Sequence, residues 1–204
     1  MLPDAVSTIP TDDAELAKAE LRRNPLYTKI PEDRKEWYID QSLTLGADAA
    51  REQLGMGRSI QALLQASGVE LIKRHARTVG GQTALRSEIE FRADKSTITV
   101  YMDSIDSIYE NSAAFAPKGL KLSKGKAFEM HVAHEFYHYL EFSSGTTTSQ
   151  RLPKLEIPLL GKLKRRVELN ETCEIAAQAF AKRFCGLSVL PTYYDLLFMK
   201  TRSL

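Results

Sequence analysis

The sequence of 204 residues predicts an α+β fold, in which a small, mostly antiparallel sheet of three or four strands packs against helices. Residues 83–92 alternate between apolar and charged side chains, which is typical of a half-solvated strand. A second strand at 97–102 is rich in β-branched and aromatic residues, and a turn-like segment joins the two into a predicted hairpin. The apolar run at 69–73 would add a third strand.

The chain before these strands is expected to be helical. Residues 11–24 have Thr11 or Asp12 as an N-cap and an acidic first turn. A second helix is expected to begin at Pro31 and to run toward Gly55, and a short helix follows at 59–64.

Beyond the strands the sequence again favours helices. The predicted helices cover residues 104–115, 123–142, 167–184 and a last stretch that begins at Pro191. Gly145 follows the stretch 123–142 and Gly186 follows the stretch 167–184, as glycine does at many helix C-termini. Proline is favoured in the first turn of a helix, which fits Pro191 at the start of the last stretch. Residues 146–166 combine a Thr/Ser tract, two prolines and a basic cluster, and they predict a long loop.

The bulk composition favours one well-cored domain. We expect residues 1–60 to form a helical segment that packs on a domain of residues 61–204. The net charge is +2, from 28 basic and 26 acidic residues. A nucleic-acid binder usually has a strongly cationic surface, so no nucleic-acid partner is expected.

The sequence also predicts where the protein resides. Its first twenty residues lack the apolar core of a secretory signal, and no later stretch is long enough to span a bilayer. We expect a cytoplasmic protein without a membrane partner. Export by a route that does not use such a signal is an alternative. Cys173 and Cys185 would lie about 18 Å apart on one continuous helix, which is too far for a disulfide.

The segment from His134 to His138, HEFYH, points to metal chemistry. Residues four apart on a helix lie one above the other, so His134 and His138 can bind one ion. Glu135 borders the same face and can take a proton from a water held by that ion. The pattern therefore predicts a Zn²⁺ cofactor, two metal-binding histidines and Glu135 as the general base.

A catalytic zinc needs a third protein ligand, which leaves the fourth position to water. The best candidate is Glu174, because Ala177 and Ala181 lie on the same helix face and would allow a close approach to the motif helix. Glu171 lies one turn earlier. It is expected either to hydrogen-bond a ligating imidazole or to replace Glu174 as the ligand.

Together these residues resemble the zincin metallopeptidases whose third ligand is a glutamate. The HEFYH motif and a later Glu in an E-x-x-A-x-A-F-A setting are most similar to the ImmA/IrrE-type peptidases and to the catalytic domain of anthrax lethal factor. The resemblance implies a zincin-like fold and zinc ligation by His134, His138 and Glu174, with Glu135 catalytic. Two features depart from the family pattern: His131 stands where an apolar or β-branched residue is usual, and the sequence identifies no residue that supports the oxyanion.

Several further residues are candidates for lesser roles. His131 shares the face of the motif histidines, and we expect it to be a donor behind the ligands, a substrate contact or a solvated residue at the cleft rim. Tyr193, Tyr194, Tyr139 and His75 are the candidate donors to the oxyanion. If strand 97–102 lies at the sheet edge, an extended substrate can pair with it.

The sequence therefore predicts a zinc metallopeptidase, more specifically an endopeptidase, that acts on a protein or peptide substrate. The alternative is a regulatory or toxin-like module that uses the same fold to bind a protein, with a structural metal or none. The sequence leaves the substrate and the oligomeric state open.

Overall fold

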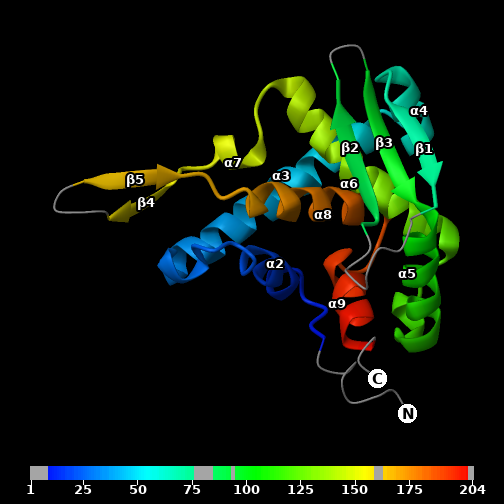
Figure 1. Ribbon diagram of the computed structural model, residues 1–204, viewed down its shortest axis with the longest axis horizontal. Coiled ribbons are helices and arrows are strands. Elements are labelled where there is room, and N and C mark those ends of the chain that lie inside the picture. The colour runs from blue at the N-terminus through cyan, green and yellow to red at the C-terminus, as the bar shows by residue number, and fades with distance from the viewer. Residues whose placement is uncertain (1–8, 76–84, 93–94, 159–162, 202–204) are drawn as a thin grey trace.

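A computed structural model describes residues 9–75, 85–92, 95–158 and 163–201. Within these ranges the protein has an α+β fold with eight α-helices and two small sheets (Figure 1), which confirms the predicted class. The helices are α2 (Asp13–Leu21), α3 (Glu32–Gly55), α4 (Ile60–Ala66), α5 (Met102–Phe115), α6 (Lys124–Ser144), α7 (Thr148–Arg151), α8 (Glu171–Cys185) and α9 (Thr192–Thr201). Two 3-10 turns, Tyr27–Lys29 and Lys118–Leu120, connect some of them.

The helix ends follow their local chemistry. Asp12 caps α2, because its Oδ1 accepts from the backbone N–H of Ala14 at 3.0 Å. Gly145 and Gly186 end α6 and α8 in the left-handed conformation, with φ of 69° and 65°. The predicted helices are thus present, with ends that shift by a few residues.

The main sheet has the order β1-β3-β2, from β1 (Glu70–Arg74), β3 (Ser96–Tyr101) and β2 (Ser87–Phe91). β2 pairs with β3 in the antiparallel sense as expected, but β1 pairs with β3 in parallel, so the expectation of a mostly antiparallel sheet is wrong. β3 takes the centre because it is the most apolar strand, with Ile98 and Val100 fully buried. Residues 83, 84, 93 and 94 of the predicted hairpin lie outside the described ranges.

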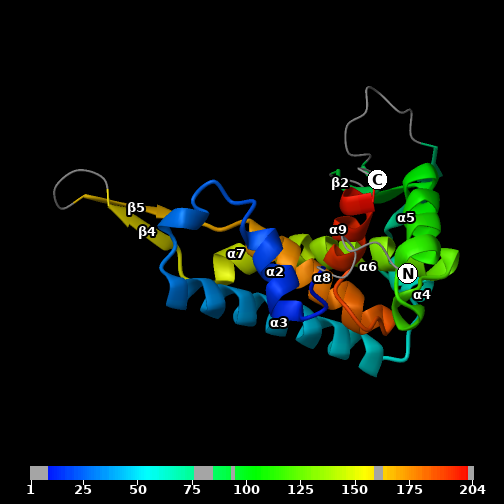
Figure 2. The ribbon, with the colours of Figure 1, turned by 90° about the horizontal axis from the view of Figure 1, so that it is seen from below.

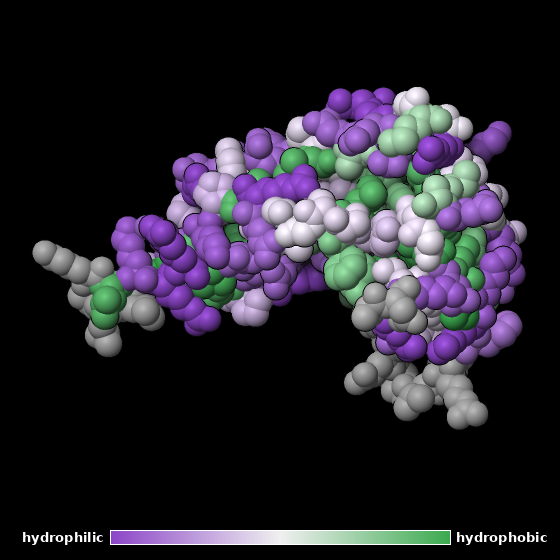
Figure 3. Space-filling view, turned by 90° about the horizontal axis from the view of Figure 1, so that it is seen from above, coloured by the Kyte–Doolittle hydropathy of each residue, from purple (hydrophilic) through white to green (hydrophobic). Residues whose placement is uncertain are grey.

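The prediction of a long loop at residues 146–166 is wrong. This segment contains α7 and most of a second sheet, in which β4 (Leu155–Pro158) pairs antiparallel with β5 (Lys164–Val167). The basic cluster belongs to β5, where Lys164 and Arg166 form ion pairs with Glu156 at 2.8 and 3.1 Å; Lys162 lies outside the described residues. This hairpin stands away from the body as an arm (Figure 1), and hydrophilic residues cover most of it in Figure 3.

The core forms around α8, which packs against α6 on one side and α3 on the other. Figure 2 shows α3 running along the molecule below α2 and α8. At the α3–α8 contact a Cβ on Gly46 would lie 2.0 Å from the carbonyl oxygen of Ala176, so only glycine permits this approach. The N-terminal helices thus share one hydrophobic core with the rest of the chain, while the boundary expected at residue 60 stays a prediction.

No helix in the described part of the chain is long and apolar enough to cross a membrane.

Candidate metal centre

Three side chains from two helices converge at one point. His134 and His138, one turn apart on α6, face Glu174 in the first turn of α8. The Nε2 atom of His134 lies 3.3 Å from Oε2 of Glu174, and Nε2 of His138 lies 3.5 Å from Oε1. The two Nε2 atoms are 3.3 Å apart. The structure therefore brings together the predicted candidate metal site, His134, His138 and Glu174, with one ligand atom from each within 4.8 Å of the others.

The distances between these atoms fit a zinc ion. Ligands at about 2.05 Å from a tetrahedral ion lie about 3.3 Å from one another, as the ligand distances of zinc require. Two imidazoles and one carboxylate are also a common ligand set of catalytic zinc sites. The donor set and its spacing thus suit a zinc ion.

The packing of α6 on α8 holds the three residues in place. Phe136, Tyr137 and Phe180 form the ring contacts between the helices, with centroids 5.6 Å apart for Tyr137 and Phe180. Ala177 and Ala181 are fully buried, as their expected place in a close helix contact requires. The carboxylate of Glu174 can therefore reach the imidazoles with its short side chain.

Charge in the cluster favours a cation. Burial opposes charge on both imidazoles, but hydrogen bonds to carboxylates outweigh it, raising the pKa of His134 above its ordinary value and that of His138 to about 10. Burial also opposes charge on Glu174, yet the two imidazoles hold the pKa of its carboxyl well below its usual range. Glu174 is thus an anion that takes its compensating charge from the histidines. A divalent ion would supply that charge instead and release protons from them.

The sequence analysis missed Glu141, which orients His138. Oε2 of Glu141 accepts from the Nδ1–H of His138 at 3.1 Å, and Oε1 accepts from the backbone N–H of Thr148 at 2.5 Å. Burial disfavours the carboxylate, but these hydrogen bonds outweigh it and lower the pKa of Glu141. Because Nδ1 of His138 carries the proton, the lone pair of Nε2 is free for a metal. The available signal was a glutamate three residues after His138 on the same helix.

The carboxylate of Glu135 is buried and lies beside the cluster. Its Oε1 accepts a hydrogen bond from Oγ of Ser87 at 2.7 Å. Ser87 begins β2, so this bond joins the motif helix to the sheet. Sequence reasoning did not single out Ser87, because the contact joins residues that are far apart in the chain.

The other candidate residues take places away from the ligand atoms. The carboxylate of Glu171 accepts from the side-chain amide of Asn24, so it supports the segment after α2 rather than a motif imidazole. His131 donates from Nδ1 to the carbonyl of Ala127 at 2.7 Å, and burial lowers its pKa to about 4, which keeps it neutral.

None of the four proposed oxyanion donors lines the two cavities that flank the candidate metal site. Tyr193 is buried in the core, and the hydroxyl of Tyr194 donates to the carbonyl of Leu120 at 2.9 Å. Tyr139 donates to the carbonyl of Ser67 at 3.1 Å. The side chain of His75 is 83% exposed and pairs with Asp103 at 2.8 Å.

The two flanking cavities meet at Glu174, which lines both. A polar cavity of about 170 Å³ lies on the side of His134 and Glu135. A cavity of about 460 Å³ lies on the side of His138, where Ile89 and Phe91 of β2 face Phe142. Phe91 and Phe142 stack with centroids 4.1 Å apart.

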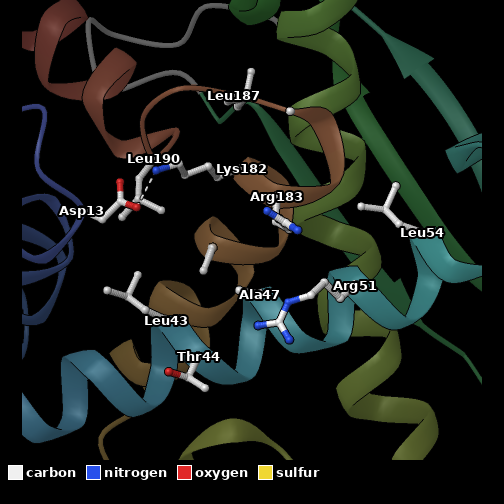
Figure 4. A pocket seen from close by; sticks show the side chains of 12 residues that line it. Asp13, Leu43, Thr44, Ala47, Arg51, Leu54, Lys182, Arg183, Leu187 and Leu190 are labelled. Carbon is white, nitrogen blue, oxygen red and sulfur yellow. Dashed lines mark hydrogen bonds and ion pairs between the residues drawn. The ribbon is translucent and has the colours of Figure 1, made fainter.

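A further cavity, of about 620 Å³, opens between α3 and the C-terminal half of α8 (Figure 4). Its lining includes leucines and basic side chains. Lys182 pairs with Asp13 at 2.5 Å, and Arg51 points into the same space. None of the three ligand residues lines it, so it is separate from the candidate metal site.

No protein family matches the chain, and no curated protein or solved structure is similar to it. The function is therefore inferred from the geometry of the site.

Proposed function

We propose that this protein is a zinc-dependent endopeptidase. The observation that carries the proposal is the convergence of His134, His138 and Glu174, with the carboxylate of Glu135 buried beside them. These three side chains would hold the ion and leave one coordination position to solvent. Zinc bound there would lower the pKa of a water toward neutrality and polarise the carbonyl of the bond to be cleaved.

Glu135 would carry the proton in this reaction. Its carboxylate accepts a proton from the attacking water as the new C–O bond forms at the peptide carbonyl. It then returns this proton to the amine nitrogen as the C–N bond breaks, so that the products are a carboxylic acid and an amine. The hydroxyl of Ser87 donates to Oε1 and fixes the direction of this carboxylate.

The edge of the sheet supports a peptide as substrate. Strand 97–102 was expected to bind an extended substrate only if it lay at the sheet edge, and this condition is not met, because β3 is the central strand and pairs on both sides. The edge strand beside the candidate metal site is β2, with Ser87 at Glu135 and Ile89 at the cavity near His138. A peptide that adds to β2 would pass the metal and continue on both sides of it, as cleavage of an internal bond requires.

The test compares Glu135→Gln with the wild-type protein after zinc-replete expression. We expect Glu135→Gln to bind as much zinc as the wild type and to cleave a random peptide library about 10²- to 10⁴-fold more slowly, because the proton acceptor is lost. Glu129→Gln is the matched control, since Glu129 lies on the same helix and pairs with Lys126. Equal cleavage by the wild type and Glu135→Gln would reject the proposal.

The alternative, a protein-binding module on the same fold, is favoured by one observation. The arm of β4 and β5 extends from the body (Figure 1), and it carries the exposed ion pairs of Glu156 with Lys164 and Arg166. The same comparison separates the two functions. A binding module would show no cleavage in the wild type and no effect of Glu135→Gln.

A further inference from the structure

The polar cavity beside Glu135 has features of a binding pocket for one substrate side chain. We infer that it accepts a carboxamide, the side chain of Asn or Gln, from the peptide being cleaved. This inference rests on the proposed peptidase function and names a feature of its substrate. Four observations support it: an unpartnered buried amide, a balance of charge, the size of the cavity and the elements that build it.

The unpartnered group is the side chain of Gln178, on α8 one turn after Glu174. Gln178 is only 9% exposed, and its Oε1 is buried and has no hydrogen-bond partner among the residues that the structure describes. It lines the same cavity as His134 and Glu135. Leaving a buried polar atom unpaired is unfavourable, so a ligand that supplies the missing bond gains affinity. A carboxamide offers both N–H donors and an acceptor, and another carboxamide is its natural complement.

The charges that line the cavity cancel in pairs. Glu20 accepts from Arg23 at 2.9 Å, and Asp195 accepts from Arg86 at 2.6 Å. The carboxylates of Glu135 and Glu174 would balance the charge of a zinc ion. His131 is neutral because burial lowers its pKa by more than its hydrogen bond to the carbonyl of Ala127 raises it. The cavity thus has hydrogen-bonding groups without a net charge, which favours a neutral polar side chain over Lys, Arg, Asp or Glu.

The size of the cavity fits this class of side chain. Its volume is about 170 Å³. An engineered protein cavity of about 150 Å³ holds one benzene molecule. The side chain of Asn or Gln therefore fits with space for its hydrogen bonds, whereas Trp does not.

The walls of the cavity come from both ends of the chain. Glu20 lies in the last turn of α2 and Arg23 follows that helix, Arg86 precedes Ser87 at the start of β2, and Asp195 belongs to α9. The N-terminal helix α2 thus contributes to the inferred pocket. A buried Glu20 beside Arg23 is difficult to explain as packing alone, because burial raises the pKa of its carboxyl and opposes its charge.

Binding of small probes tests the inference without any cleavage. The probes are N-acetyl-glutaminamide, the apolar N-acetyl-methioninamide and the cationic N-acetyl-lysinamide, titrated by NMR into the zinc-loaded wild-type protein. We expect the glutamine probe to bind about tenfold more tightly than the other two, since a site built for hydrogen bonds rejects analogues that lack them. Tighter or equal binding of the methionine or lysine probe would overturn the inference.

Two variants connect this preference to Gln178. Gln178→Leu keeps the size of the side chain and removes its amide, so it should abolish the preference while the zinc content stays unchanged. Gln178→Glu should turn the preference toward the lysine probe, which provides a second reading if the leucine variant folds poorly. Gln65→Leu, at an exposed position of α4, is the control and should behave as the wild type. A preference that survives in both Gln178 variants would overturn the inference.

Cleavage provides a separate reading. Products of a random peptide library should show Asn or Gln enriched about tenfold at one fixed position near the cleaved bond, and Gln178→Leu should remove this enrichment. Probe selectivity without any cleavage would reject the peptidase and keep the pocket. Cleavage without Asn or Gln enrichment would reject the pocket and keep the peptidase.

Discussion

At the residue scale, Glu141 controls the availability of His138 for a metal. It accepts the Nδ1 proton and is itself held by the backbone of Thr148. Groups that hold a ligating histidine in this way typically account for a 10- to 100-fold difference in metal affinity. We therefore expect Glu141→Ala to weaken zinc binding by about 10- to 100-fold, measured by competition with a chelator.

The control for this change is Glu129→Ala, on the same helix, which should leave zinc affinity unchanged. Glu141→Ala also removes the acceptor for Thr148, so its fold must first be checked by circular dichroism. A folded Glu141→Ala protein with wild-type zinc affinity would show that His138 does not depend on this carboxylate.

Ser87 is expected to position Glu135 rather than to bind substrate or metal. Replacing Ser87 by Ala removes the hydrogen bond to Oε1 and should lower kcat about tenfold, with little change in KM or zinc content. Ser87→Thr keeps a hydroxyl and should restore most of the rate. A change in KM alone, or no rescue by Thr, would contradict a positioning role.

These residues show how far a sequence can predict a site. His134, Glu135 and His138 are predictable because four-residue spacing on a helix places side chains on one face whatever the rest of the fold does. Glu174 was predictable from the small residues that follow it on its helix. Ser87 and Gln178 carry no such local pattern, since their roles arise only when β2 and α8 meet α6.

At the scale of elements, the contact between α3 and α8 sets the place of Glu174. A Cβ on Gly46 would meet backbone atoms of Ala176, which no rotamer change can relieve. We therefore expect Gly46→Ala to destabilise the protein by about 1–3 kcal/mol, because the helices must move apart. For a chain of this size each kcal/mol lowers Tm by about 2–4 °C, which calorimetry can measure.

Gly55→Ala is the matched control on the same helix. A Cβ there meets nothing within 4 Å, so Tm should stay constant or rise slightly. Because α8 carries Glu174, Gly46→Ala should also weaken zinc binding while Gly55→Ala does not. Equal Tm values for the two variants would show that α3 and α8 can separate without cost.

The strands were harder to predict than the helices. Alternation, β-branched composition and an apolar run identified the three strands of the main sheet, but the parallel pairing of β1 with β3 is a long-range contact that no local pattern shows. The strands β4 and β5 escaped prediction because each has only four residues and β5 carries three consecutive basic residues, two of which find their partner, Glu156, on the other strand. Charged hairpins of this kind resemble loops in composition.

At the scale of the whole molecule, α8 connects the candidate metal site to the core. One side of it carries Glu174 and Gln178 toward α6 and β2, and the other meets α3. The N-terminal helices therefore belong to the same folded unit as the site. The sequence predicted helices in residues 11–55 but not this role, because only Gly46 marks the contact and a single glycine in a helix is not specific.

The burial of weak acids in this shared core predicts a loss of stability at high pH. Burial raises the pKa of the Cys185 thiol from 9 to about 12, and it raises the pKa of Tyr137 and Tyr194 from 10 to about 12. Each group thus keeps its proton in the folded protein at pH values where the unfolded chain has lost it. The resulting stability is complete below pH 9 and is lost as the pH rises to about 12.

We make this prediction for the zinc-loaded protein, in which the metal takes the place of the protons on His134 and His138. Its urea midpoint of unfolding should be constant from pH 7 to 9 and should fall steeply from pH 9 to 12, by an amount equivalent to several kcal/mol, since one pKa unit is about 1.4 kcal/mol.

Burial also raises the pKa of the Cys173 thiol, and in the unfolded chain the two thiols ionise at a lower pH than the tyrosines. The double variant Cys173→Ala/Cys185→Ala removes both of them. Its midpoint should be lower than that of the wild type at pH 7, because a cavity forms, but it should begin to fall about one pH unit later. If both proteins begin to lose stability at the same pH, the two thiols do not contribute to the alkaline transition.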